Sequence, residues 1–219
     1  MKKKILVVAV HLDDETLGCG GSLLKHKANG DEINWLICTT IDKNQNYYQT
    51  REKEMNKVSK LYAFNSVHSL LLKTTRIDEY SISKLIEKIS KVINKVKPNI
   101  IYLPFKGDVH SDHRRIFEAS YSCTKSFRYP FIKKIYMMET LSETEFAPST
   151  KEDSFIPNTF VDISKHMDKK IQLMQIYKNE IGKHPFPRSE RNIRALGTLR
   201  GATCGYEYAE SFMLLKQIL

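Results

Sequence analysis

The chain has 219 residues, of which 41% are apolar and 27% charged, and its formal net charge is +10. This composition supports a sizeable core and excludes wholesale disorder, and the length suits one domain over residues 1–219. The longest apolar run near the N-terminus, Ile5–Val10, is far short of the ~20 residues of a membrane-spanning helix. It is also too short for a signal-peptide core of ~7–15 residues. We therefore expect a soluble, cytoplasmic protein with no transmembrane segment.

The positive charge is compatible with an anionic partner or with a solvated, lysine-rich surface. Lysines such as Lys84, Lys88 and Lys91 are spread along a helical pattern and are not concentrated with aromatic residues. Because the sequence also contains no nucleic-acid-binding motif, we expect no nucleic-acid partner.

The first half of the chain alternates strand and helix patterns. In order, we expect a strand at Ile5–Val10, a helix at Thr16–Asn29, a strand at Ile33–Thr39, a helix at Thr50–Ala63, a strand at Val67–Leu72, a helix at Ser81–Val96 and a strand at Asn99–Leu103. This order predicts an α/β domain with a Rossmann-like, mostly parallel sheet flanked by helices. In such sheets ligands bind beyond the carboxyl ends of the strands.

The second half is less regular. We expect a helix at Asp112–Lys125, a strand at Lys134–Met138, a polar loop at Glu139–Thr159, an edge strand at Thr159–Ile163, a helix at Ser164–Glu180 with Ser164 as N-cap, a loop at His184–Pro187 and a closing strand at Tyr208–Leu215. The loops at 41–50, 139–158 and 183–200 are expected to set specificity.

Two clusters of histidines and acids follow predicted strands. His11–Glu15 reads His-Leu-Asp-Asp-Glu after the first strand, and His110–His113 reads His-Ser-Asp-His after the strand at Asn99–Leu103. A catalytic zinc needs three nitrogen or oxygen ligands and one open position. His11, Asp14 and one histidine of the second cluster meet this need, which leaves Asp13 free as a base. Either cluster alone is commonly a solvated turn, but their joint placement favours a metal site.

Residues 10–21 resemble the opening motif of the PIG-L/LmbE family of zinc-dependent N-deacetylases, which reads A-H-P-D-D-E followed by glycines. His110–His113 is similar to the H-x-D-H motif of the family, and Asp108 to an acid that often precedes it. Weaker similarities occur at Arg51 with Glu54, at 160–164, at 200–201 and at 208–212. Leu12 stands where the family usually has proline, which removes a constraint on the turn but no ligand. The resemblance implies an LmbE-like fold and removal of acetyl from an N-acetylglucosamine-type sugar.

The resemblance also implies roles for the matching residues. These roles are zinc ligation by His11, Asp14 and His113, general-base catalysis by Asp13, stabilisation of the tetrahedral intermediate by a positively charged His110, orientation of a histidine by Asp112 and contact with the sugar or its anionic group by Arg51. Among unmatched residues, Tyr47 is placed to stack on a sugar ring. His184 and Arg188 flank a proline-rich loop that is expected to border the substrate mouth.

Several alternatives stay open. Fe²⁺ or Mn²⁺ can share such nitrogen and oxygen ligands with Zn²⁺. The sugar can be free or linked to a nucleotide, a lipid or a glycan, and the same machinery would hydrolyse a non-sugar N-acyl amide. A non-catalytic nucleotide- or nucleic-acid-binding α/β protein is the alternative from another class. A homo-oligomer is compatible with the sequence.

Overall fold

The computed structural model describes residues 2–41 and 47–219. The elements are β1 (Lys4–Ala9), α1 (Asp14–Ala28), β2 (Glu32–Thr40), α2 (Tyr48–Tyr62), β3 (Ser66–Lys73), the short 3-10 helix η1 (Ile77–Glu79), α3 (Ile82–Val96), β4 (Ile100–Leu103), α4 (Ser111–Ser122), β5 (Lys134–Met138), β6 (Thr159–Asp162), α5 (Met167–Met174), α6 (Glu190–Cys204) and β7 (Ala209–Gln217). The described strands form one sheet in the order β3-β2-β1-β4-β5-β7-β6. Strands β1 to β5 are parallel, whereas β7 is antiparallel to both of its neighbours. The expected α/β fold with a mostly parallel sheet is confirmed.

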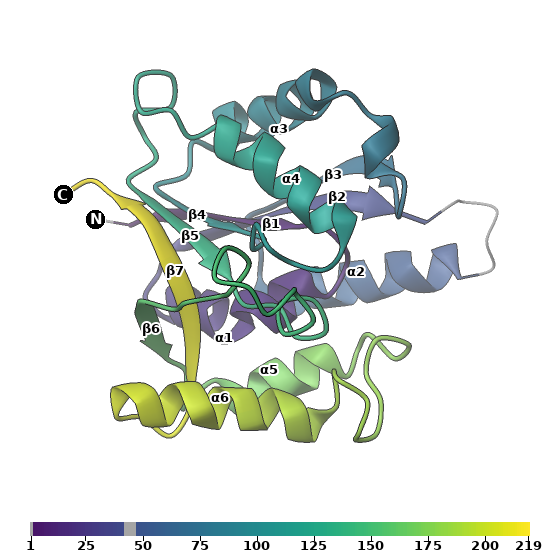
Figure 1. The fold of residues 1–219 in the computed structure, drawn as a ribbon, viewed down its shortest axis with the longest axis vertical. Helices are drawn as coiled ribbons and strands as arrows, with labels where there is room; N and C mark the ends of the chain where they lie inside the picture. The colour runs from purple at the N-terminus through teal and green to yellow at the C-terminus, as the bar shows by residue number, and fades with distance from the viewer. Residues whose placement is uncertain (1, 42–46) are drawn as a thin grey trace.

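Helices cover both faces of this sheet (Figure 1). α3 and α4 lie on one face, and α1, α2, α5 and α6 lie on the other. Strand β1 explains the arrangement, because Val7 packs into the core on the α1 side and Val8 into the core on the α3 side. A strand buried on both faces needs a continuous apolar run. In the described ranges, no helix is long and apolar enough to cross a membrane.

Helix α1 is broken at Cys19, whose φ of −148° and ψ of 22° are not helical. The backbone N–H groups of Gly21 and Ser22 would lose their helical partners at such a break. They donate instead to the Glu210 carboxylate, at 2.8 and 2.7 Å. Glu210 lies on β7, so a residue of the C-terminal strand caps the second half of α1.

The broken end of the first half of α1 is satisfied by a lysine. The Lys170 ammonium, from α5, donates to the Leu17 carbonyl at 2.8 Å and to the Glu210 carboxylate at 2.7 Å. Both charged side chains are buried. The two freed N–H groups and the freed Leu17 carbonyl therefore all have charged partners. These contacts fix the end of the short first half of α1 against β7 and α5.

The long helix expected at Ser164–Glu180 is wrong in its extent, because α5 covers only Met167–Met174. Ser164 is not an N-cap, since its hydroxyl donates to the Asp162 carboxylate at 2.7 Å. After Met174 the chain leaves the helix and turns inward. This turn places the buried Tyr177 hydroxyl against α1 and carries Glu180 to the site described below.

The loop predicted at 183–200 is wrong for residues 190–200, which belong to helix α6. Gly197 and Gly201 lie inside the helix and lower its helical propensity. Packing requires glycine at Gly201, where a Cβ would meet the Tyr206 carbonyl oxygen at 2.5 Å. At Gly197 a Cβ would meet the terminal methyl group of Met167 at 2.3 Å, so that side chain would have to move.

Candidate active site

The two motifs meet at the carboxyl ends of β1 and β4, which are paired neighbours in the sheet. His11 and Asp14 lie on the turn that connects β1 with α1, and His113 lies in the first turn of α4. Residues 102 positions apart in the sequence are therefore side by side.

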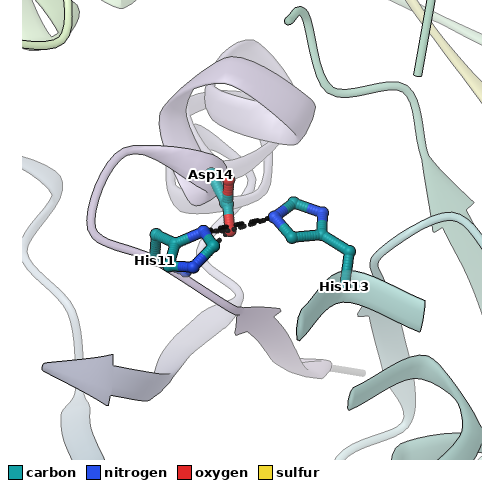
Figure 2. Close-up of side chains that lie close together, drawn as sticks. All are labelled: His11, Asp14 and His113. Carbon is teal, nitrogen blue, oxygen red and sulfur yellow. Dashed lines mark hydrogen bonds and ion pairs between the residues drawn. The ribbon is translucent and has the colours of Figure 1, made fainter. Parts of the chain in front are cut away.

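Figure 2 shows the His11, Asp14 and His113 side chains converging on one point. His113 Nε2 lies 3.3 Å from His11 Nδ1 and 3.4 Å from Asp14 Oδ2, and His11 Nδ1 lies 3.9 Å from the same oxygen. Ligands bound to a tetrahedral zinc at 2.0–2.2 Å would be roughly 3.3–3.6 Å apart. These three donors could therefore form one face of a metal coordination shell without large rearrangement.

Each of the two histidines has a carboxylate partner on its other ring nitrogen. His113 Nδ1 lies 2.8 Å from Asp108 Oδ2, and His11 Nε2 lies 3.3 Å from Asp112 Oδ2. A neutral histidine that donates to these acids presents its remaining lone pair to the shared point. Carboxylate partners of this kind fix the tautomer and orientation of metal-binding histidines.

Charge at this point is unbalanced. Burial disfavours protonation of His113, but Asp14 and Asp108 outweigh burial and raise the pKa of His113 to about 9. Without a metal, a proton on His113 therefore supplies positive charge at this point. In the neutral form that binds a metal, two lone pairs and a carboxylate oxygen face one another and repel unless a cation lies between them. The donor set and its charge fit a divalent metal ion.

A second group of potential ligands, His11, His110 and Asp112, is less suited to a metal. Asp112 Oδ2 accepts from the Thr75 backbone N–H at 2.7 Å as well as from His11. His110 caps α4, with Nδ1 accepting from the Asp112 backbone N–H at 3.1 Å. Two of these potential ligand atoms, Asp112 Oδ2 and His110 Nδ1, therefore already have partners within the protein.

Asp13 has an unusual backbone conformation in the turn between β1 and α1. Its φ of 120° is rare for a residue with a side chain. The turn is held on both sides. The Asp13 carbonyl accepts from the backbone N–H groups of Thr16 and Leu17 at 2.9 and 2.8 Å, and its own N–H donates to Glu15 at 3.2 Å. Burial and the neighbouring Asp14 raise the pKa of the Asp13 carboxyl well above its usual value. A carboxyl group with a raised pKa is suited to proton transfer near neutral pH.

Glu15 and Tyr177 support the turn, although the sequence predicts no role for either residue. Glu15 is fully buried and accepts hydrogen bonds from the Tyr177 hydroxyl at 2.8 Å and from the Thr16 hydroxyl at 2.6 Å. Burial raises the pKa of Glu15 to about 7. The motif could have drawn attention to Glu15, since an acid inside an apolar helix start needs partners. Nothing local in the sequence indicated Tyr177.

His11, Asp13, Asp14 and His110 border a cavity of about 250 Å³, just below the usual range for small-molecule sites. Its walls come from the loops after β1, β2, β3, β4 and β5 and from the segment between α5 and α6. The lining residues are His11, Leu12, Asp13, Asp14, Leu17, Thr39, Thr40, Ile41, Tyr47, Arg51, Thr74, His110, Ser142, Glu143, Glu180 and Arg188.

Three of the four residues expected to bind substrate line this cavity: Tyr47, Arg51 and Arg188. His184 is exposed and is not among the lining residues. Arg51 also has an internal role, because its guanidinium donates to the Leu12 carbonyl at 2.6 Å. It thereby supports the turn in which leucine replaces the proline of the family pattern. Of the expected loop at 41–50, residues 42–46 lie outside the described residues, and the expectation is wrong for residues 48–50, which belong to α2.

The fold and this site define an α/β protein with a candidate divalent-metal centre and an adjacent buried carboxyl group. The model of the PIG-L family, described as GlcNAc-PI de-N-acetylase, matches residues 6–124. This match covers more than half of the chain and includes both motifs. The chain belongs to the PIG-L family of deacetylases.

Known proteins similar to the chain agree with this membership. Diacetylchitobiose deacetylase from Thermococcus kodakarensis is 23% identical over 229 residues, which cover 99% of this chain and 84% of the relative. The structure of N,N'-diacetylchitobiose deacetylase from Pyrococcus horikoshii matches with a TM-score of 0.78 at 20% identity, over 98% of this chain and 84% of that one. The structure of GalB, a 4-carboxy-2-hydroxymuconate hydratase from Pseudomonas putida, matches with a TM-score of 0.75 at 15% identity, over 100% and 98% of the two chains. Because one fold carries different reactions, the assignment of a reaction depends on the site.

Proposed function

We propose that residues 1–219 form one catalytic domain of a cytoplasmic, metal-dependent deacetylase. It removes the acetyl group from an N-acetylglucosamine-type sugar, which gives acetate and a free amine. One observation carries the proposal: His11, Asp14 and His113 converge on one point, and the buried Asp13 lines a cavity together with His11 and Asp14. Family membership supports the reaction type, and the names of the diacetylchitobiose deacetylases support the sugar class. Four free cysteines are in keeping with a reducing compartment.

In this proposal His11, Asp14 and His113 hold the metal, with Zn²⁺ as first choice and Fe²⁺ or Mn²⁺ as alternatives for the same donors. A bound divalent metal would supply Lewis acidity and lower the pKa of water. Asp108 and Asp112 orient the two histidines through their outer ring nitrogens.

Asp13 acts as the general base in this proposal. Its carboxylate takes the proton of the attacking water and then delivers it to the departing amine, because an amine leaves far more readily once protonated. The strained turn holds this carboxylate beside Asp14 without using it as a hydrogen-bond cap. Arg51 contributes by fixing the Leu12 carbonyl in the same turn.

His110 acts in this proposal as a neutral hydrogen-bond donor and not as the cation expected from the resemblance. Burial and the neighbouring His11 and His113 lower the pKa of His110 to about 4. Since Nδ1 accepts from the Asp112 N–H, the hydrogen of the neutral ring is on Nε2. A neutral donor aimed at the developing oxyanion still stabilises it.

The test is acetate release from N,N'-diacetylchitobiose, N-acetylglucosamine and N-acetylcysteine by the zinc-loaded protein. We expect release from the sugars, and we expect Asp13→Asn to keep stoichiometric metal but lose about 10²–10⁴-fold in turnover. Asp78→Asn removes an exposed acid and is the matched control. Release only from N-acetylcysteine would show that the substrate is a non-sugar amide. Wild-type turnover by Asp13→Asn would show that Asp13 is not the general base.

A further inference from the structure

The candidate cavity contains two arginines, and Glu180 holds one of them firmly. Arg188 donates from Nε to the Glu180 carbonyl at 2.6 Å and from Nη2 to the Glu180 carboxylate at 2.9 Å. Its remaining terminal nitrogen, Nη1, donates to the Ser142 hydroxyl at 2.8 Å. All three guanidinium nitrogens therefore have protein partners.

Glu180 also faces the second arginine. Arg51 Nη1 lies 3.5 Å from Glu180 Oε1 and 3.1 Å from Glu54 Oε2, while Nη2 donates to the Leu12 carbonyl. Glu180 thus contacts Arg51 through one carboxylate oxygen and Arg188 through the other. The two arginines are only 12% and 19% exposed, so these contacts are poorly screened by solvent.

The described lining has no uncompensated positive charge. Besides Glu180, three acids line the cavity (Asp13, Asp14 and Glu143), and the described arginines are only Arg51 and Arg188. Together with the two arginines, a divalent metal ion would only balance the formal charge of these four acids, so no excess positive charge would be left for an anionic substituent. The excess of +10 over the whole chain lies elsewhere, as on α3, where Lys84, Lys88 and Lys91 are exposed or half-buried.

We propose that Glu180 restricts this site to N-acetyl sugars that carry no phosphate or carboxylate, a proposal that rests on the proposed deacetylase function. A phosphate in the cavity would meet arginines that are already neutralised, and it would approach several carboxylates. Like charges brought together in an interface are strongly unfavourable. Uncharged hydroxyl groups can share hydrogen bonds with the paired arginines and carboxylates at no such cost. The substrate class is therefore a free N-acetylated sugar or its uncharged glycoside.

The test compares N-acetylglucosamine with N-acetylglucosamine 6-phosphate as substrates of the metal-loaded protein. For the wild type we expect kcat/KM to favour the neutral sugar by about 100-fold or more, because the Glu180 carboxylate already neutralises arginines that would otherwise attract a phosphate. Glu180→Gln removes the negative charge that the two arginines share, and we expect it to reduce this preference by about tenfold or more. Glu143→Gln is the matched control, since it removes an acid of the same cavity that is not paired with either arginine. We expect it to change the preference by less than about threefold.

A binding measurement separates this proposal from the deacetylase assignment. Calorimetry with glucosamine and glucosamine 6-phosphate, the corresponding products, needs no turnover, and we expect the wild type to bind the neutral compound more tightly. Equal or tighter binding of the phosphorylated product, or equal use of the phosphorylated substrate, would overturn the role of Glu180. An equal effect of the Glu180 and Glu143 variants would also overturn it. Acetate release from neither substrate would contradict the proposed function and leave the binding result to decide the charge preference.

Discussion

The first half of α1 lies between two buried clusters of charged side chains. At its C-terminal end, Lys170 and Glu210 pair with each other and with the broken backbone of the helix. At its N-terminal end, Asp14 faces the two imidazoles of His11 and His113. Both clusters join segments that are distant in the sequence, and both are shielded from water.

The clusters differ in how their charges are balanced. The Lys170–Glu210 pair has one positive and one negative group, and each contacts freed backbone groups of α1. The second cluster is backed by Asp108 and Asp112, and carboxylates outnumber fixed cations in it. We therefore interpret the balanced Lys170–Glu210 pair as a structural contact, and the second cluster, whose negative charge lacks a cation, as a binding site.

The largest effect is expected from removing one ligand of the proposed metal site. His113→Ala should abolish stoichiometric zinc binding and reduce turnover by about a thousandfold or more, because metal catalysis is worth several kcal/mol. Elemental analysis and acetate release measure the two effects, and metal stripping of the wild type should reproduce the loss of activity. Tight, stoichiometric zinc in the His113→Ala protein would show that the ligand set is different.

Breaking the Lys170–Glu210 pair should lower the stability of the protein rather than its affinity for metal. Lys170→Met leaves Glu210 as a buried, uncompensated charge, and we expect it to lower the free energy of unfolding by about 3–5 kcal/mol. The double variant Lys170→Met/Glu210→Gln removes that charge and should recover part of the loss. Urea denaturation measures both variants. A single variant within about 1 kcal/mol of the wild type would mean that the pair does not support α1.

Orientation of a ligand is expected to matter less than the ligand itself. Asp112→Asn should lower zinc affinity or turnover by about 10–100-fold, because the amide no longer provides His11 Nε2 with a carboxylate acceptor. Glu118→Gln changes an exposed acid on the same helix and is the matched control. Metal affinity is measured by competition with a chelator. An unchanged affinity and turnover in Asp112→Asn would indicate that backbone contacts alone orient His11.

The sequence predicted the half of the molecule in which local patterns decide the structure. Strand β1 needs an unbroken apolar run because both of its faces are buried, and this run is visible in Ile5–Val10. The parallel order of strands then placed His11 and His113 at one edge, so their proximity followed from topology. For this reason the fold class and the convergence of the two motifs could be expected without coordinates.

The rest depends on contacts that no local pattern encodes. Gly197 and Gly201 argue against a helix by propensity, yet α6 forms, and at Gly201 the backbone of Tyr206 and Glu207 lies so close that a side chain would not fit. Glu180 appeared in the sequence as the end of a helix, and its role between Arg51 and Arg188 exists only after the chain folds back. Such side chains form the cavity wall, so substrate selectivity was harder to predict than the metal-binding residues.

The smallest effect is expected from the contact of Tyr177 with Glu15, next to the turn that carries Asp13. Tyr177→Phe removes the hydroxyl that donates to Glu15 at 2.8 Å, and Glu15 in turn accepts from the Asp13 backbone N–H. Glu15 keeps its bond from Thr16, so the loss of unfolding free energy should be only about 1–2 kcal/mol. Tyr121→Phe removes an exposed hydroxyl and is the matched control in urea denaturation. A drop in turnover without any loss of metal would place Tyr177 in the support of Asp13, whereas equal stability and turnover in both variants would show that Glu15 and Thr16 hold the turn without it.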